Sequence, residues 1–196
     1  MEIKGDLTDE IYRDDRYVII QILNCVATRS HGLSKILGDK YPYSDSYKYR
    51  KCISPNLNRA EILDRPVPGS IKCCSSGDIK GPNIINIFGQ FYMGKSGGFY
   101  SKRILAQRNI DDHLRKGIHM DTKDNRLKWF EEGLTKIITR FAESPSPMIF
   151  LFPYKIGCNL AGGNWPDYHQ KIKEFAIDME SIDKEKQVYI VNFNLK

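Results

Sequence analysis

The sequence MIFLFPYKIGCNLAGGNW occupies residues 148–165 and carries the clearest structural signal in the chain. Its first part, 148–154, is a continuous apolar run, which is typical of a strand buried on both faces of a sheet. A glycine-rich turn covers 157–163, and Trp165 begins a segment whose apolar residues have helical spacing. A buried strand that leads through a glycine-rich loop into a helix indicates an α/β layered domain.

The same alternation of strands and helices continues on both sides of this stretch. Further strands are predicted at 17–26, 70–74, 83–92 and 187–193, and helices at 32–40, 127–141 and 165–179. Residues 43–65 show no clear period, and the basic segment 95–124 allows a short helix around Ile104, Ile110 and Leu114. The length of 196 residues suits a single domain, 1–196, with 95–124 as a basic insertion.

The bulk composition excludes several classes of protein. Apolar residues make up 41% and charged residues 28% of the chain, as in ordinary globular proteins. No apolar run is long enough to span a bilayer, and the N-terminus lacks the features of a secretory signal. The five cysteines form no Cys-x-x-Cys pair, so neither a disulfide framework nor a zinc site is indicated. We therefore expect an intracellular protein, cytoplasmic or nuclear, without metal, cofactor or membrane partner.

The net charge of +6 is unevenly distributed. Residues 29–51 carry six Lys or Arg against two Asp, and residues 95–128 carry nine against four. Basic surfaces favour polyanions or a phosphate-bearing small ligand, although a solvated face without a partner fits equally well. Tyrosines interleave with the first basic group, which suits weak nucleic-acid binding by stacking or packing over the sheet edge: Tyr41, Tyr43, Tyr47 and Tyr49.

Two junctions between a strand and a helix are the predicted places for chemistry, since ligands bind beyond the carboxyl ends of such strands. The first, residues 23–33, offers the amide of Asn24, the guanidinium of Arg29 and the imidazole of His31. Free N–H groups at the helix start near Gly32 add a site for a phosphate or a sugar hydroxyl.

The second junction, residues 152–165, contains three glycines. Glycines let the backbone approach a ligand closely and turn several N–H groups toward it, as a diphosphate site requires. The spacing is not that of a Walker loop, because no Gly-Lys-Ser/Thr follows. A plain tight turn is the alternative interpretation.

Taken together, the two junctions resemble those of the macrodomain family. Residues 5–8, Gly-Asp-Leu-Thr, resemble the family's Gly-Asp-Ile-Thr, and Asn24 followed by a glycine-opened helix and Lys-Tyr-Pro at 40–42 resembles its first ligand loop. Residues 156–165 are similar to Ile-Gly-Cys-Gly-Leu-Ala-Gly-Gly-x-Trp, the second loop of the branches that resemble ADP-ribose 1''-phosphate phosphatases and terminal ADP-ribose glycohydrolases. A viral member of these branches is one interpretation.

This resemblance implies a three-layer α/β/α fold with a mixed sheet of about six strands, and a cleft for ADP-ribose or an ADP-ribosylated substrate. It implies that Asp6 accepts from the adenine amino group, that 157–163 holds the diphosphate, and that Asn24 lies at the distal ribose or braces its loop. The expected ligand-binding set is Asp6, Leu7, Asn24, Arg29, Ser30, His31, Gly32, Leu33, Gly157, Cys158, Asn159, Leu160, Ala161, Gly162 and Gly163.

The sequence also departs from the family's known hydrolytic patterns. Ala27 stands where one branch has a second Asn, while Gly-Gln at 89–90 and Ala161 stand where another has its Lys and Asp. The remaining candidate catalytic residues are His31, whose imidazole could exchange a proton near neutral pH, and Asn24 as its partner. Arg29 could clamp a terminal phosphate.

His31 could instead only brace its loop, and Cys158 is interpreted as a structural residue rather than a nucleophile. Three functions therefore stay open. The chain could process an ADP-ribose derivative as a phosphatase or ADP-ribosyl hydrolase. It could bind ADP-ribose or ADP-ribosylated protein without chemistry, or bind nucleic acid.

Overall fold

A six-stranded sheet forms the centre of the computed structural model, which describes residues 1–75, 77 and 80–193. The strands lie in the order β1-β6-β5-β2-β4-β3. Four neighbouring pairs are parallel, and β3 is antiparallel to β4, so the sheet is mixed. The strands are β1 (Glu2–Lys4), β2 (Tyr17–Asn24), β3 (Ile71–Cys74), β4 (Asn83–Gln90), β5 (Met148–Pro153) and β6 (Lys186–Asn192).

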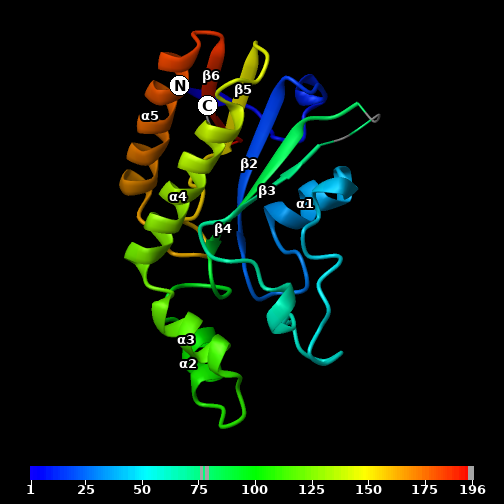
Figure 1. Cartoon of the computed structure of the whole chain (residues 1–196), viewed down its shortest axis with the longest axis vertical. Coiled ribbons are helices and arrows are strands. Elements are labelled where there is room, and N and C mark those ends of the chain that lie inside the picture. The colour runs from blue at the N-terminus through cyan, green and yellow to red at the C-terminus, as the bar shows by residue number, and fades with distance from the viewer. Residues whose placement is uncertain (76, 78–79, 194–196) are drawn as a thin grey trace.

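Helices cover both faces of this sheet. The long helices α4 (Lys123–Phe141) and α5 (Trp165–Ile182) lie side by side on one face, and α1 (Leu33–Lys40) lies on the other (Figure 1). The predicted α/β class, with a mixed sheet between two helical layers, is confirmed. Only β1 was not expected as a strand, because three residues that alternate between charged and apolar give a weak signal.

The continuous apolar strands are explained by burial on both faces. Alternate residues of β2 and β5 point to opposite layers, so Phe150 and Phe152 pack with Phe130 of α4 and Phe175 of α5. On the other face, residues such as Leu151 pack toward α1. Apolar side chains therefore fill the space on both faces of the sheet, between it and each helical layer.

A polar pair interrupts this apolar core. Gln21 of β2 and Asn86 of β4 are paired in the register of the two strands, and both are buried. The Nε2 atom of Gln21 donates to Oδ1 of Asn86 at 2.8 Å. Asn86 in turn donates through Nδ2 to the carbonyl of Ser44 at 3.0 Å and to Oγ of Ser46 at 2.7 Å. The pair thus links the two central strands to the segment that follows α1.

The basic segment 95–124 forms two helices where the sequence indicated one. These are α2 (Phe99–Leu105) and α3 (Asp112–Met120), which extend beyond the end of the sheet (Figure 1). Asp111 starts α3 by accepting from the N–H of Leu114 at 2.7 Å, which is why Ile110 lies between the helices. Leu114 and Ile118 are buried against the carboxyl ends of β2 and β4. The segment therefore contributes to the core as well as to the basic surface.

Short 3-10 turns lie at Glu10–Tyr12, Pro42–Ser44 and Ile62–Asp64. No helix in the described part of the chain is long and apolar enough to cross a membrane.

Candidate functional site

A cavity of about 690 Å³ lies at the carboxyl ends of the parallel strands. Its walls come from the N-terminal turn after β1, the start of α1, the second loop after β5 and the end of β6. Of the residues that the sequence assigned to a ligand site, the cavity is lined by Asp6, Leu7, His31, Gly32, Leu33, Gly157, Cys158, Asn159, Leu160 and Ala161. The structure thus brings segments from both ends and the middle of the chain together at one opening.

In the N-terminal turn, one carboxylate oxygen of Asp6 is used for structure. Its Oδ1 accepts hydrogen bonds from the N–H and the hydroxyl of Thr8, both at 2.8 Å. The other oxygen, Oδ2, has no hydrogen-bond partner within the described residues. Asp6 can therefore hold its turn and still accept from a ligand in the cavity.

The start of α1 presents backbone donors without a capping side chain. Gly32 is the N-cap residue and has φ 58° and ψ −133°, a conformation that favours glycine. Ser34 uses its hydroxyl on the preceding turn, donating to the carbonyl of His31 at 2.9 Å. In the part of the chain that the structure describes, the N–H groups of Gly32, Leu33 and Ser34 have no partner. Such a helix start attracts anions, because its N–H groups and the helix dipole both favour negative charge.

The second loop, residues 155–163, makes its backbone hydrogen bonds mostly within itself. Cys158 N–H donates to the carbonyl of Lys155 at 3.0 Å, and Gly162 N–H donates to that of Asn159 at 3.2 Å. Gly163 N–H donates to the carbonyl of Gly157 at 3.0 Å. The N–H groups of the three residues 159–161 have no partner among the described residues, and all three residues line the cavity. The loop therefore offers a second set of free backbone donors to the same space.

Close packing explains why glycine is required in this loop. A Cβ at Gly163 would lie 2.7 Å from the carbonyl oxygen of Gly157, and one at Gly157 would lie 2.6 Å from the ring of Tyr168. Gly157 and Gly162 also have φ values of 72° and 74°, which side chains disfavour. The glycines thus allow both the turn and its close contact with α5.

Asn24 lies outside the lining of this cavity. Its Oδ1 accepts from the N–H groups of Val26 at 3.2 Å and Ala27 at 2.7 Å, and its Nδ2 donates to the hydroxyl of Tyr47 at 3.3 Å. The amide therefore braces the first junction, which was the alternative interpretation. These bonds also end β2 at Asn24, two residues before the predicted end of the strand.

Four further residues of the expected ligand set also lie outside the lining. Arg29 donates through its guanidinium to the carbonyl of Pro55 at 3.1 Å, so it braces the segment after α1. Ser30 precedes the lining residues of the first junction. Gly162 and Gly163 end the second loop, and a Cβ added at Gly162 would lie 2.9 Å from Cγ of Lys95.

His31 and Cys158 both border the cavity but differ in chemical character. His31 is exposed, and its ring has no hydrogen-bond partner within the described residues. Cys158 donates through Sγ to the carbonyl of Ile156 at 3.2 Å, and burial raises the pKa of its thiol to about 11. Cys158 is therefore protonated at neutral pH, which disfavours a nucleophilic role.

The cavity also contains polar residues that the sequence did not single out as ligand-binding. Gln21 and Gln90 line it from β2 and β4, and Lys155 and Asn192 line it from the second loop and β6. A polar residue inside an otherwise apolar strand was an available signal for Gln21. Among the described residues, no cluster of His, Cys, Asp or Glu could hold a metal ion.

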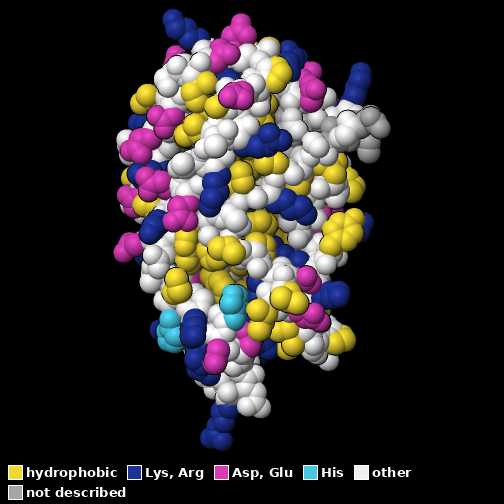
Figure 2. All heavy atoms as spheres, in the orientation of Figure 1, with side chains coloured by type: hydrophobic (Ala, Val, Ile, Leu, Met, Phe, Trp, Pro, Cys, Tyr) yellow, Lys and Arg dark blue, Asp and Glu magenta, His cyan; other side chains and the backbone are white. Residues whose placement is uncertain are grey.

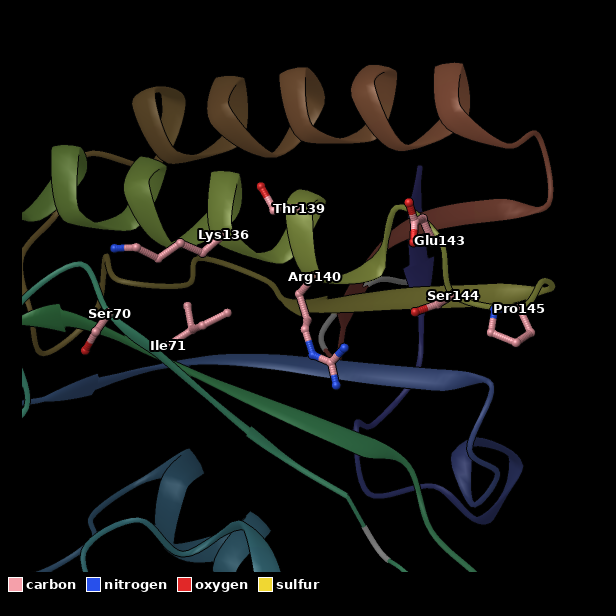
Figure 3. Close-up of a pocket in the computed structure, with 8 residues that line it drawn as sticks. All are labelled: Ser70, Ile71, Lys136, Thr139, Arg140, Glu143, Ser144 and Pro145. Atoms are coloured by element: carbon pink, nitrogen blue, oxygen red, sulfur yellow. The ribbon is translucent and has the colours of Figure 1, made fainter.

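A larger hollow of about 860 Å³ lies between α4 and β3 (Figure 3). Figure 3 shows Arg140 and Lys136 extending from α4 into this region. Lys136 already donates to the carbonyl of Gly69 at 2.6 Å. The hollow is lined by neither the start of α1 nor the second loop. It therefore lacks the two sets of free backbone N–H groups that line the smaller cavity.

The tyrosine-rich segment after α1 mainly supports the first junction. Tyr41 and Tyr47 are buried, and Tyr43 donates to the carbonyl of Pro82 at 2.7 Å. Arg50 stacks on Tyr47 and donates to the carbonyls of Asn24 and Ala27 at 3.0 and 2.7 Å. On the face shown in Figure 2, the Lys and Arg side chains are scattered, and acidic side chains gather at the edge formed by α5. These contacts favour packing over base stacking for this segment.

Two of the solved structures that resemble this chain illustrate its similarity to known proteins. No protein-family model matches the chain, and no curated protein matches it. A structural-genomics protein from Bacteroides thetaiotaomicron has a TM-score of 0.58 and 22% identity, covering 98% of both chains. The macrodomain of Mycobacterium tuberculosis DarG has a TM-score of 0.52 and 15% identity, covering 98% of this chain and 97% of that one. The chain therefore has the macrodomain fold.

Proposed function

We propose that the cavity at the carboxyl ends of the strands binds ADP-ribose, either free or attached to a protein. The observation that carries this proposal is that two sets of backbone N–H groups without a partner among the described residues, at 32–34 and 159–161, line the same cavity. A diphosphate between them would receive several N–H bonds at once, strengthened by the α1 dipole. The macrodomain fold and the resemblance of residues 156–165 to the family's second loop support the same ligand.

In this proposal other lining residues contact the two ends of the ligand, the adenine and the distal ribose. Asp6, through its free Oδ2, accepts from the adenine amino group, while Leu7 and Leu33 supply apolar contact for the base. The distal ribose lies toward His31 and Gln90. Asn24 contributes indirectly, because it holds the turn between β2 and the residues that lead into α1.

Isothermal titration calorimetry with ADP-ribose tests the proposal. We expect a Kd in the micromolar range, equivalent to about −8 kcal/mol, and much weaker binding of AMP. The unfolding temperature should rise when ADP-ribose is added, because a ligand that binds only the folded state stabilises that state. Absence of both heat and stabilisation at millimolar ADP-ribose would contradict the proposal.

A second candidate function is processing of an ADP-ribose derivative, either a 1''-phosphate or an ADP-ribosyl ester. His31 favours it, because the imidazole borders the cavity and no other described group occupies its nitrogens. General acid–base catalysis typically contributes a factor of about 10²–10⁴, so His31→Ala should reduce turnover by that factor. Its ADP-ribose affinity should stay within a few-fold of the unmutated protein.

Phosphate release from the 1''-phosphate and cleavage of ADP-ribosylated protein measure this second function. Full activity in His31→Ala would remove His31 from the mechanism. Binding without turnover on any of these substrates would leave a reader of ADP-ribose as the function.

A further inference from the structure

A buried ion pair lies behind the second loop, outside the cavity. Arg126, in the first turn of α4, donates through Nε to Oδ1 of Asp121 at 2.7 Å and through NH2 to Oδ2 at 2.6 Å. The side chains of Arg126 and Asp121 are only 3% and 1% exposed. Asp121 is the residue that ends α3, so the pair joins α3 to α4.

The pair makes further hydrogen bonds to two backbone segments, residues 91–94 and Ala161. NH1 of Arg126 donates to the carbonyls of Gly94 at 2.7 Å and Ala161 at 3.0 Å, and NH2 also donates to that of Tyr92 at 3.1 Å. The two oxygens of Asp121 additionally accept from the N–H groups of Phe91 at 3.2 Å and Tyr92 at 2.9 Å. A guanidinium has five N–H donors, and all five are therefore used.

The bond from Arg126 to Ala161 differs from the other hydrogen bonds of the second loop. Other backbone hydrogen bonds of residues 155–163 stay within residues 153–163. Among the residues that the structure describes, the bond from Arg126 to Ala161 is the one hydrogen bond that joins this loop to another element, in addition to its packing on α5. Ala161 belongs to the set of unpaired N–H groups at 159–161, so its carbonyl is held from behind while its N–H stays free.

Stability alone does not account for this arrangement. Burying two charges costs several kcal/mol per ion, and apolar residues of similar volume often replace a buried pair without loss. What apolar residues could not supply is a set of directed donors that fixes three carbonyl groups in space. The segment 91–94 is fixed by the same pair, and the next residue, Lys95, lies so near the second loop that a Cβ added at Gly162 would be 2.9 Å from its Cγ.

We propose that Arg126, oriented by Asp121, is a positioning residue that holds the second loop in the conformation that binds the ligand's diphosphate. This inference rests on the proposed ADP-ribose function for its consequence in binding. Its structural part, that Arg126 orders residues 157–162, stands on the contacts described above.

The variant Arg126→Lys tests this inference, because lysine keeps the charge but not the planar fork. One ammonium has three donors and cannot serve both oxygens of Asp121 and the carbonyls of Gly94 and Ala161. The matched control is Arg65→Lys. Arg65 is also buried and pairs with both oxygens of Asp111 at 2.7 and 2.9 Å, but it braces α3 and the carbonyl of Ala60 instead of the second loop.

Hydrogen exchange in the ligand-free proteins gives the first measurement. Exchange of the hydrogen-bonded amides of Cys158, Gly162 and Gly163 should become faster in Arg126→Lys, and it should be unchanged in Arg65→Lys. The second measurement is calorimetry with ADP-ribose, in which Arg126→Lys should bind about 10- to 100-fold more weakly, as expected when a binding group is displaced. Arg65→Lys should bind ADP-ribose like the unmutated protein, even if its unfolding temperature falls as much as that of Arg126→Lys.

If Arg126→Lys does not fold, the double variant Arg126→Met with Asp121→Asn removes both charges together and should show the same faster exchange. Unchanged exchange of the amides of Cys158, Gly162 and Gly163 in a folded variant would overturn the inference. Faster exchange with unchanged ADP-ribose affinity would also overturn it. If the unmutated protein binds no ADP-ribose, the proposed function fails, and the exchange result alone decides whether Arg126 orders the loop.

Discussion

The ammonium group of Lys40, in the last turn of α1, donates a hydrogen bond to the carbonyl of Thr8 in the N-terminal turn. It also forms an ion pair with Glu10 at 2.9 Å. Thr8 is the residue that binds Oδ1 of Asp6, so Lys40 connects α1 to the turn that carries Asp6. Two of the sequence motifs that resemble macrodomains, at 5–8 and 40–42, are therefore in direct contact.

This contact predicts an effect of Lys40→Met on ligand binding from outside the cavity. Losing the hydrogen bond to Thr8 should loosen the Asp6 turn and weaken ADP-ribose binding by about 0.5–1.5 kcal/mol, the usual contribution of one hydrogen bond. Calorimetry measures the change. Lys35→Met is the control, because within the described residues Lys35 forms its ion pair with Asp39, on the exposed side of the same helix. Equal losses in both variants would show that helix stability, not the turn, is responsible.

Asp6→Ala should weaken ADP-ribose binding by about 1–3 kcal/mol, because an acceptor for the adenine amino group is removed. Ribose 5-phosphate lacks adenine, so its binding should not change. Asp9→Ala provides the control, since Asp9 braces the same turn by accepting from the N–H of Asp6 at 3.0 Å. Competition assays with both ligands measure the two affinities. Equal weakening of both ligands by Asp6→Ala would mean that Asp6 does not contact the base.

Gly163→Val should abolish ADP-ribose binding, because its Cβ would meet the carbonyl of Gly157 at 2.7 Å and force the second loop to move. Gly97→Ala is the control. Gly97 has φ 61°, but no atom lies within 4 Å of its added Cβ, so the cost is backbone strain of about 1 kcal/mol. Circular dichroism confirms folding, and calorimetry measures binding. A folded Gly163→Val protein with unchanged affinity would show that the loop is only a turn.

Asp111 should contribute to stability in a pH-dependent way. The Arg65 guanidinium, followed by the N–H of Leu114, holds the pKa of Asp111 below its ordinary value. Its contribution is therefore present above the unfolded-state pKa of about 3.9 and is lost as pH falls through the lower folded-state pKa. Asp111→Asn can still cap α3 but loses the charge, so it should be about 1–3 kcal/mol less stable at pH 7. Urea unfolding from pH 7 to pH 2.5 should show this difference in stability shrinking progressively as the pH falls below about 4.

Cys158 should react slowly with iodoacetamide at neutral pH, although it lines the cavity. Burial raises the pKa of its thiol to about 11, and only the thiolate is nucleophilic. The rate should therefore rise about tenfold per pH unit between pH 7 and 9.5, and bound ADP-ribose should protect the thiol. Mass spectrometry after timed labelling measures both effects. A plateau near pH 8 would contradict the raised pKa.

The main elements could be predicted from the sequence because their apolar patterns are long and regular. The strands at 17–24, 83–90 and 148–153 and the helices α4 and α5 follow from runs that only a covered sheet and its amphipathic helices can bury. In 95–124, by contrast, the break between α2 and α3 depends on the capping bond of Asp111, which no periodicity reveals.

The site was predicted in part for a similar reason. Glycines at 157–163 and the helix start at Gly32 act through their backbone, so their position in the chain nearly determines their role. Asn24 was harder to interpret, because an amide at the end of a strand can bind a ligand or its own backbone, and here Val26 and Ala27 satisfy it. Arg126 has no local motif, since its partners come from residues 92, 94, 121 and 161.

The paired amides of Gln21 and Asn86 also affect how the two central strands choose their alignment. The interiors of β2 and β4 are mainly Ile, Val, Leu and Phe, so sliding one strand by two residues would again place apolar groups opposite apolar groups. Such a slip would move Gln21 opposite Ile84 or Phe88 and leave Nε2 of Gln21 and Oδ1 of Asn86 unpaired inside the core. Each unpaired group costs about 1–3 kcal/mol. The amide pair therefore discriminates against misaligned sheets that the hydrophobic side chains alone would tolerate.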